Sequence, residues 1–123
     1  PFGFVRDLSV FMNAADILIT KPGGLTCSEA LSIQLPMILT HPIPGQEERN
    51  VQFLLRHKVA SLAETPEDLT HAGADLLKHP KKEMLLRHRA KILARPYAAW
   101  EAARLIFDLI NHRGSFEKRD SAR

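Results

Sequence analysis

The 123-residue sequence contains a single cysteine, Cys27, and no long run of apolar residues. One cysteine excludes an intrachain disulfide and a metal site built from several thiolates, and it fits a reducing compartment. No stretch approaches the roughly 18 apolar residues that a transmembrane helix requires, and no signal peptide is visible. The six histidines are scattered along the chain, so we expect no metal and no cofactor.

The sequence also has little excess of charge of either sign. Its formal net charge is +3, from 17 basic and 14 acidic residues, and no aromatic-plus-basic pattern accompanies that charge. We therefore expect no nucleic acid partner. Apolar residues make up 45% of the chain and charged residues 25%, as in ordinary globular proteins, and the length suffices for one compact domain.

Short apolar stretches alternate with segments of helical periodicity. We predict strands at residues 2–5, 17–20, 37–40 and 59–62. We predict helices at about residues 7–15, 26–35, 46–57, 65–78, 81–94 and 96–111. This order predicts an α/β domain in which a Rossmann-like parallel sheet carries helices on both faces and several helices follow. We assign residues 1–112 to this domain and, with Gly114 ending the last helix, residues 113–123 to a polar tail.

The first residues, P-F-G-F-V, contain no methionine and have the character of a strand end. We interpret the chain as a piece of a longer protein whose domain is truncated at its N-terminus. Such a piece can bind a ligand that it does not turn over by itself.

The most informative stretch is residues 17–29, I-L-I-T-K-P-G-G-L-T-C-S-E. An apolar strand runs through Gly23 and Gly24 into a helix predicted to begin near Thr26, an arrangement that presents backbone N–H groups to an anion. The glycines let a phosphate approach, and Glu29 can accept hydrogen bonds from a vicinal diol such as a ribose. The spacing Thr26-x-x-Glu29 is equally that of a capping box, which needs no ligand.

A second loop, H-P-I-P-G-Q-E-E-R-N at residues 41–50, follows the next predicted strand. Both loops therefore belong to the carboxyl edge of the sheet, where ligands of such folds bind. Gln46 and Glu47 place a carboxamide beside a carboxylate, which suits a polyhydroxylated ring. The alternative is that the acidic residues only complement the dipole of the helix that begins there.

Together the two loops resemble a known family. K-P-G-G-L-T-C-S-E-A-L, then P-M, then P-I-P-G-Q-E-E-R-N is similar to the C-terminal half of glycosyltransferases that make glycolipids on diacylglycerol. These are the monogalactosyldiacylglycerol synthases and the processive diacylglycerol glucosyltransferases, relatives of the peptidoglycan N-acetylglucosaminyltransferase with its two-domain GT-B fold. The resemblance covers about residues 2–62, and from residue 65 on it rests on the helical layout.

The resemblance implies that this domain binds a UDP-hexose donor without a metal. The positions that it assigns to the donor are Gly23, Gly24, Leu25 and Thr26 around the diphosphate, Glu29 at the ribose, Gln46, Glu47 and Asn50 at the hexose, and Phe4 and Val5 beside the uracil. It also implies inverting transfer to a lipid acceptor such as diacylglycerol, at a cytoplasmic, peripheral location on the inner face of a membrane.

The family places the catalytic base and the acceptor site in the N-terminal domain. We therefore assign no catalytic residue to this chain and expect it to be inactive by itself, His41 being a poor candidate for the base. Two other functions stay open: a sugar-nucleotide-binding subunit of a split N-acetylglucosaminyltransferase, and a noncatalytic α/β module that binds another anion.

The helix predicted at residues 81–94 is rich in lysine and arginine. Such a helix can lie on the headgroups of an anionic membrane. A run of charges is more often a solvated face, and Leu85, Leu86, Ile92 and Leu93 give this helix an ordinary core stripe.

Overall fold

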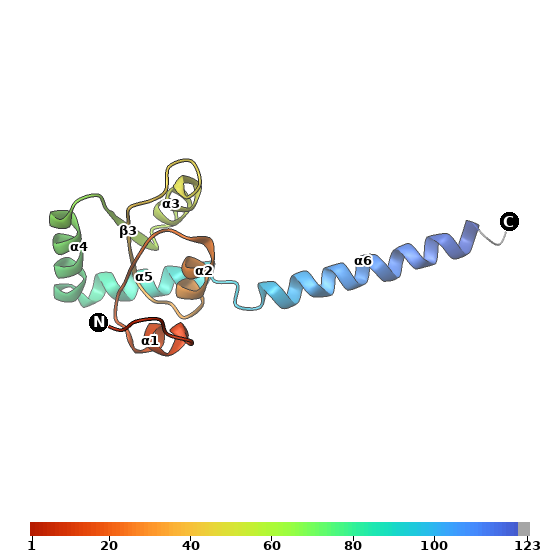
Figure 1. Cartoon of the computed structure of the whole chain (residues 1–123), viewed down its shortest axis with the longest axis horizontal. Coiled ribbons are helices and arrows are strands. Elements are labelled where there is room, and N and C mark those ends of the chain that lie inside the picture. Colours follow the sequence, from red (N-terminus) through yellow and green to blue (C-terminus); the bar gives the residue numbers. More distant parts are fainter. Residues whose placement is uncertain (121–123) are drawn as a thin grey trace.

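The computed structural model describes residues 1–120, with side chains to residue 111. Strands β1 (Leu18–Thr20), β2 (Met37–Thr40) and β3 (Ala60–Ala63) form one parallel sheet in the order β1-β2-β3. The helices of the described chain are α1 (Leu8–Ala14), α2 (Gly24–Ser32), α3 (Glu48–Arg56), α4 (Pro66–Lys78), α5 (Pro80–Leu93) and α6 (Ala98–Asp120). This architecture, shown in Figure 1, confirms the predicted Rossmann-like α/β fold.

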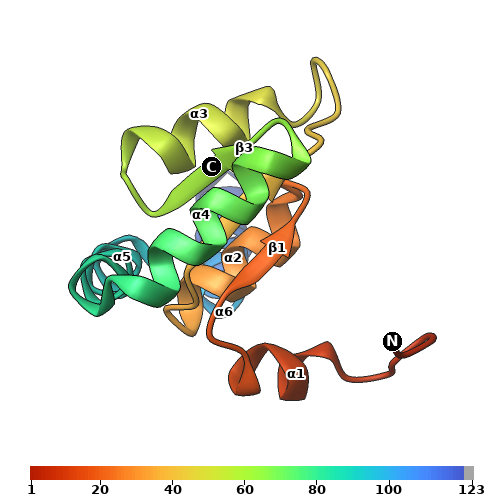
Figure 2. The ribbon, with the colours of Figure 1, turned by 90° about the vertical axis from the view of Figure 1, so that its left-hand side faces the viewer.

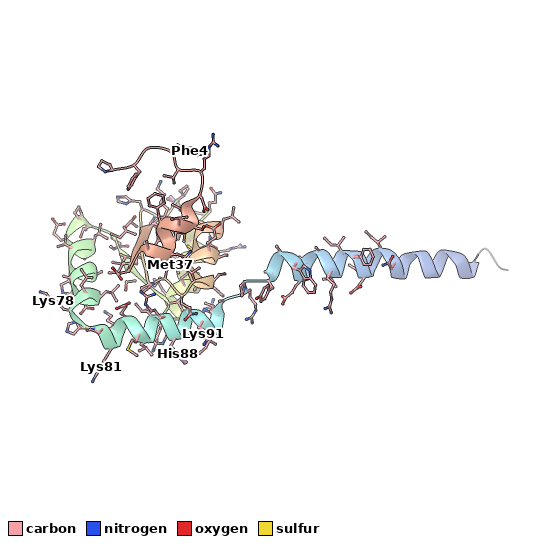
Figure 3. All side chains as sticks on the ribbon, turned by 90° about the horizontal axis from the view of Figure 1, so that it is seen from below. Phe4, Met37, Lys78, Lys81, His88 and Lys91 are labelled. Atoms are coloured by element: carbon pink, nitrogen blue, oxygen red, sulfur yellow. The ribbon has the colours of Figure 1, made fainter. Side chains whose placement is uncertain are left out.

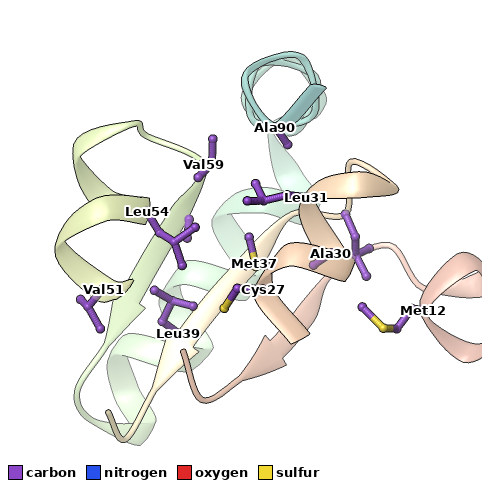
Figure 4. Close-up of a cluster of buried hydrophobic side chains, with 12 residues drawn as sticks. Met12, Cys27, Ala30, Leu31, Met37, Leu39, Val51, Leu54, Val59 and Ala90 are labelled. Carbon is purple, nitrogen blue, oxygen red and sulfur yellow. The ribbon is translucent and has the colours of Figure 1, made fainter. Parts of the chain in front are cut away.

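The central strand β2 is buried on both faces because its side chains alternate between two cores. Met37 and Leu39 point into a cluster shared with α2 and α3 (Figure 4). Ile38 points the other way, where it meets Leu76 of α4 and Leu86 of α5. The sheet therefore has helices on both faces, and the loops after its strands are held at one edge.

The predicted strand at residues 2–5 is wrong. Figure 2 shows the N-terminal segment extending away from the sheet beyond α1, and the side chain of Phe4 is 96% exposed. Phe2 instead packs its ring edge-to-face on Phe11 of α1, with 5.0 Å between the ring centroids. A short apolar segment forms a strand only when a neighbouring strand supplies hydrogen bonds, and within the described chain β1 pairs only with β2.

The same topology leaves β1 less well covered than β2. β1 is an edge strand, and Ile19 at its centre is 54% exposed. An apolar run of four residues predicts a strand but not its position in the sheet.

The predicted start of α4 is confirmed in detail. Thr65 accepts a hydrogen bond from the backbone N–H of Asp68 at 3.1 Å, and the Asp68 carboxylate accepts from the N–H of Thr65 at 3.0 Å. Pro66 occupies the first helical position, where its missing N–H costs nothing.

Helix α6 leaves the rest of the molecule and extends into solvent (Figure 1). It continues through Gly114 to Asp120, so the predicted helix end at Gly114 is wrong. A glycine weakens a helix by about 1 kcal/mol and ends it only when the following residues also leave the helical path. Residues 121–123 of the predicted tail lie outside the described residues. Within the described chain, no helix combines the length and apolar character needed to cross a bilayer.

Candidate functional site

The loop after β1 and the loop after β2 meet at the carboxyl edge of the sheet. Nδ2 of Asn50, in the first turn of α3, donates a hydrogen bond of 2.8 Å to the carbonyl oxygen of Pro22. A Cβ atom added to Gly23 would lie 3.8 Å from Oε1 of Glu47. The two motifs therefore form one local structure, as their places after adjacent strands predicted.

The N-terminus of α2 has no side-chain cap. Gly23 is the N-cap residue, with extended backbone (φ −67°, ψ 138°), and Gly24 is the first helical residue. Thr26 therefore lies inside the first turn, and the capping-box interpretation of Thr26 and Glu29 is wrong. Because glycine offers no side-chain oxygen, the first N–H groups of α2 stay available, and the helix dipole favours an anion in front of them.

The two glycines leave open space at this helix end. A Cβ at Gly24 would lie 4.0 Å from Nδ2 of Asn50, an ordinary van der Waals distance, and the Gly23 backbone is one that any residue adopts. Neither glycine is therefore required by its neighbours or by its own conformation. The absent side chains instead let a ligand approach the backbone N–H groups closely.

Glu47 and Gln46 have different positions in the second loop. Oε2 of Glu47 accepts a 2.9 Å hydrogen bond from the N–H of Ile43, and the N–H of Glu47 donates to the Ile43 carbonyl at 3.0 Å. These bonds close the loop, and Gly45 turns it with a positive φ of 76°. Since α3 begins at Glu48 rather than at residue 46, Gln46 lies in the loop itself with an exposed side chain.

Glu29 lies one turn into α2 beside a cavity of about 850 Å³. Its carboxylate is exposed and has no hydrogen-bond or ion-pair partner in the part of the chain described. The cavity lies between α1, α2 and the start of α6, and its lining includes Leu25, Glu29 and Arg6. A volume of this size is typical of small-molecule sites.

Of the residues predicted to bind the donor, Leu25 and Glu29 line this cavity, whereas Phe4 and Val5 do not. The next residue along the chain, Arg6, also lines it. Sequence reasoning missed Arg6 because an arginine before a helix start is usually a solvated residue; its position directly after the predicted uracil segment was the available signal. The hydroxyl of Ser28 already has a hydrogen-bond partner within α2, because its Oγ donates to the carbonyl of Gly24 at 2.7 Å.

The thiol of Cys27 is buried below this helix turn. Burial, and secondarily the carboxylate of Glu47, raises the pKa of Cys27 to about 11. The thiol is therefore neutral at physiological pH and is not a nucleophile. Among the residues that the structure describes, no group of three or more histidine, cysteine or acidic side chains is arranged to hold a metal.

This pKa predicts slow alkylation. In the folded chain at pH 8, iodoacetamide is expected to react with Cys27 at least about 100-fold more slowly than in the urea-unfolded chain, because an unfolded thiol ionises near pKa 8.5. The measurement is the rate of mass gain in both states. Rates that agree within threefold would contradict the buried position of the thiol.

Comparison with known proteins gives relatives over most of the chain. It is 32% identical over 116 residues to a processive diacylglycerol beta-glucosyltransferase of Staphylococcus saprophyticus, and 34% identical over 98 residues to one of Bacillus cereus. These matches cover 94% and 80% of the chain. The chain spans 30% and 25% of the length of those two relatives. No family model matches the chain.

A solved structure, that of MurG from Acinetobacter baumannii, shares the fold with a TM-score of 0.74 and 23% identity. The match covers 87% of this chain and 33% of that one. The comparisons confirm the resemblance carried by the two loop motifs, and they confirm the fold as that of a GT-B C-terminal domain.

Proposed function

We propose that this chain is the donor-binding part of a glycosyltransferase that moves a hexose from a UDP-sugar to a lipid acceptor such as diacylglycerol. The observation that carries the proposal is the hydrogen bond from Asn50 to Pro22. It joins the second loop, whose Gln46 and Glu47 suit a sugar, to the glycine loop before the uncapped N-terminus of α2. The relatives are named as diacylglycerol beta-glucosyltransferases, which supports the choice of a hexose as the transferred group and of diacylglycerol as the acceptor.

The diphosphate of the donor would bind in front of α2. The backbone N–H groups of Gly24, Leu25 and Thr26 would donate to its oxygens, and the helix dipole adds to their effect. Donors fixed in this way stabilise the negative charge that develops on UDP as it leaves. The acceptor hydroxyl would then attack the anomeric carbon with inversion, its proton removed by a base outside this chain.

The sugar and the nucleoside would lie on either side of the diphosphate. Gln46 is exposed at the tip of the second loop and would bind hexose hydroxyls, with Glu47 and Asn50 holding the loop in place. Glu29 would accept from the ribose hydroxyls, and the adjacent cavity offers room for the uracil. Phe4 and Val5 would lie beside the uracil, as the resemblance to the family implies.

A lipid acceptor implies that the protein acts at a membrane. We propose that the protein works as a peripheral enzyme on the cytoplasmic face of a bilayer, where a soluble nucleotide sugar and a membrane lipid meet. The acceptor site and the base would belong to parts of the protein that this chain does not include, so it would be inactive by itself.

Calorimetric titration with UDP, UDP-glucose, UDP-galactose and NAD tests the donor assignment. Glu29→Gln is expected to weaken UDP about fivefold, the loss of one exposed hydrogen bond of about 1 kcal/mol. Gln46→Ala should weaken a UDP-hexose about fivefold and leave UDP unchanged. Glu67→Gln, in the exposed first turn of α4, is the matched control for Glu29.

Each titration result tests one part of the donor assignment. If NAD binds as well as UDP, or if UDP shows no binding at millimolar concentration, the donor class is wrong. If Glu29→Gln behaves like the Glu67→Gln control, the ribose assignment is wrong. Equal losses of UDP and UDP-hexose in Gln46→Ala would remove this residue from the sugar site.

A further inference from the structure

His41 has an unusual backbone conformation at the carboxyl end of the central strand. Within the described residues, three residues other than glycine have a positive φ: Gln34 (60°), His41 (46°) and Lys58 (54°). The left-handed region crowds the Cβ atom of every residue except glycine. Each of these three conformations therefore needs a cause.

The ends of two helices explain Gln34 and Lys58. Gln34 follows α2, and the N–H of the next residue donates to the carbonyl of Ala30 at 2.9 Å. Lys58 follows α3, and the N–H of the next residue donates to the carbonyl of Leu54 at 3.1 Å. A left-handed residue that lets the chain satisfy the last carbonyls is an ordinary way to end a helix. These two conformations are therefore consequences of the fold.

No helix ends at His41. It is the first residue after β2, and it precedes Pro42, whose ring favours extended backbone in the residue before it. The imidazole is exposed and has no hydrogen-bond or ion-pair partner in the part of the chain described. The rings of His57 and His79, by contrast, each contact a carbonyl of the preceding helix, at 2.8 and 2.9 Å. Costly backbone conformations without a structural cause are concentrated at ligand sites.

The register of the sheet brings His41 beside the glycine loop. In this register Thr20 of β1 is the partner of Leu39 of β2. Extending it by two residues places His41 opposite Pro22, which immediately precedes the N-cap residue Gly23. His41 therefore lies where the second loop begins, next to the proposed diphosphate site.

The diphosphate that leaves during the transfer needs hydrogen-bond donors for the charge that develops on it. The lysines of α5 do not supply them, because α5 lies at the amino edge of the sheet, where Arg89 donates to the carbonyl of Lys58 at 3.4 Å. Figure 3 shows Lys81 and Lys91 pointing outward from α5, with Met37 of the central strand in the middle of the domain. Donors for the diphosphate have to come from the carboxyl edge, where His41 lies.

We propose that the imidazole of His41 donates a hydrogen bond to the β-phosphate of the bound UDP-sugar, an inference that rests on the proposed function. Either tautomer of a neutral imidazole carries one N–H donor. When the bond between the anomeric carbon and the β-phosphate oxygen breaks, its electron pair stays on UDP. His41 stabilises the charge of that leaving group together with the N–H groups at the start of α2.

Calorimetric titration with UDP and UMP tests this inference, because UMP has no β-phosphate. His41→Gly is expected to weaken UDP at least about 10-fold, the loss of one hydrogen bond to a charged group, and to leave UMP within twofold. His41→Gln should keep UDP within threefold of the unmodified chain, because its amide N–H can replace the ring N–H. Glutamine already takes a positive φ in this chain, at Gln34.

The matched control is Lys58→Gly, at the other exposed left-handed position. Glycine adopts this backbone without crowding, so urea unfolding should show that neither glycine variant is less stable than the unmodified chain. Lys58→Gly should bind UDP and UMP as the unmodified chain does.

Four results would overturn the inference while leaving the donor assignment intact. They are equal losses of UDP and UMP in His41→Gly, a loss of the same size in Lys58→Gly, a loss that His41→Gln does not recover, and unchanged UDP affinity in all three variants. If the unmodified chain binds no UDP at millimolar concentration, the donor assignment is wrong and this inference is wrong with it.

Discussion

Replacing Gly24 with alanine is expected to weaken UDP binding about 30-fold while making the folded chain slightly more stable. The added methyl group meets only Nδ2 of Asn50, at 4.0 Å, so the protein itself accommodates it. Alanine in the first helical position also restricts the unfolded chain, which raises the free energy of unfolding by about 0.5 kcal/mol. The same methyl group occupies the space through which a phosphate reaches the N–H groups of α2. Losing one such charge-assisted contact corresponds to about 2 kcal/mol.

The matched control for this change is Gly73→Ala. Gly73 lies inside α4, and a Cβ there has no neighbour within 4 Å. This variant should gain similar or greater stability, up to about 1 kcal/mol, with UDP affinity unchanged. Urea unfolding and calorimetric titration of the two variants separate the effects. Unchanged UDP affinity in Gly24→Ala would show that no phosphate lies against this helix end.

Replacing Asn50 with alanine is expected to weaken UDP about tenfold and to cost about 1 kcal/mol of unfolding free energy. Nδ2 of Asn50 holds the carbonyl of Pro22, and the variant leaves that buried proline's acceptor without its partner. The glycine loop then samples positions in which its N–H groups no longer converge on one anion. Asn50 is thus a positioning residue, and its effect on affinity passes through the loop.

A comparable bond elsewhere provides the control. Oγ1 of Thr70 donates to the carbonyl of Pro66 at 2.9 Å on the exposed side of α4. Thr70→Ala removes a side-chain to backbone bond of the same kind and should leave UDP affinity within twofold of the unmodified chain. If both variants weaken UDP equally, general destabilisation explains the loss, and the bridge between the loops has no special part in binding.

Local sequence rules predicted the elements that depend on nearby residues. Thr65, Pro66 and Asp68 lie within four positions of one another, so the start of α4 was readable from the chain. The alternation of Met37, Ile38 and Leu39 between two cores likewise follows from the period of a strand. The two loops were placed at one edge because parallel strands end together, and the Asn50–Pro22 bond confirms that placement.

The errors concern features that depend on distant partners and the exact residue at which a helix begins. Residues 2–5 have the composition of a strand, but strand formation requires a neighbour that composition does not reveal. The spacing of Thr26 and Glu29 fits a capping box. The helix begins two residues before Thr26, at Gly24, so both residues lie inside it. Arg6 became a candidate only when the fold brought α1 beside α2 around one cavity.

The central claim is that a UDP diphosphate binds at the start of α2 between the two loops. Titrating the ¹⁵N-labelled chain with UDP and following its backbone amides by NMR tests that claim directly. If the diphosphate binds there, the largest shifts are expected at Gly24, Leu25 and Thr26, with smaller ones around Glu29 and none on the outer side of α5. Saturating shifts confined to other parts of the chain, or no shifts at millimolar UDP, would contradict it.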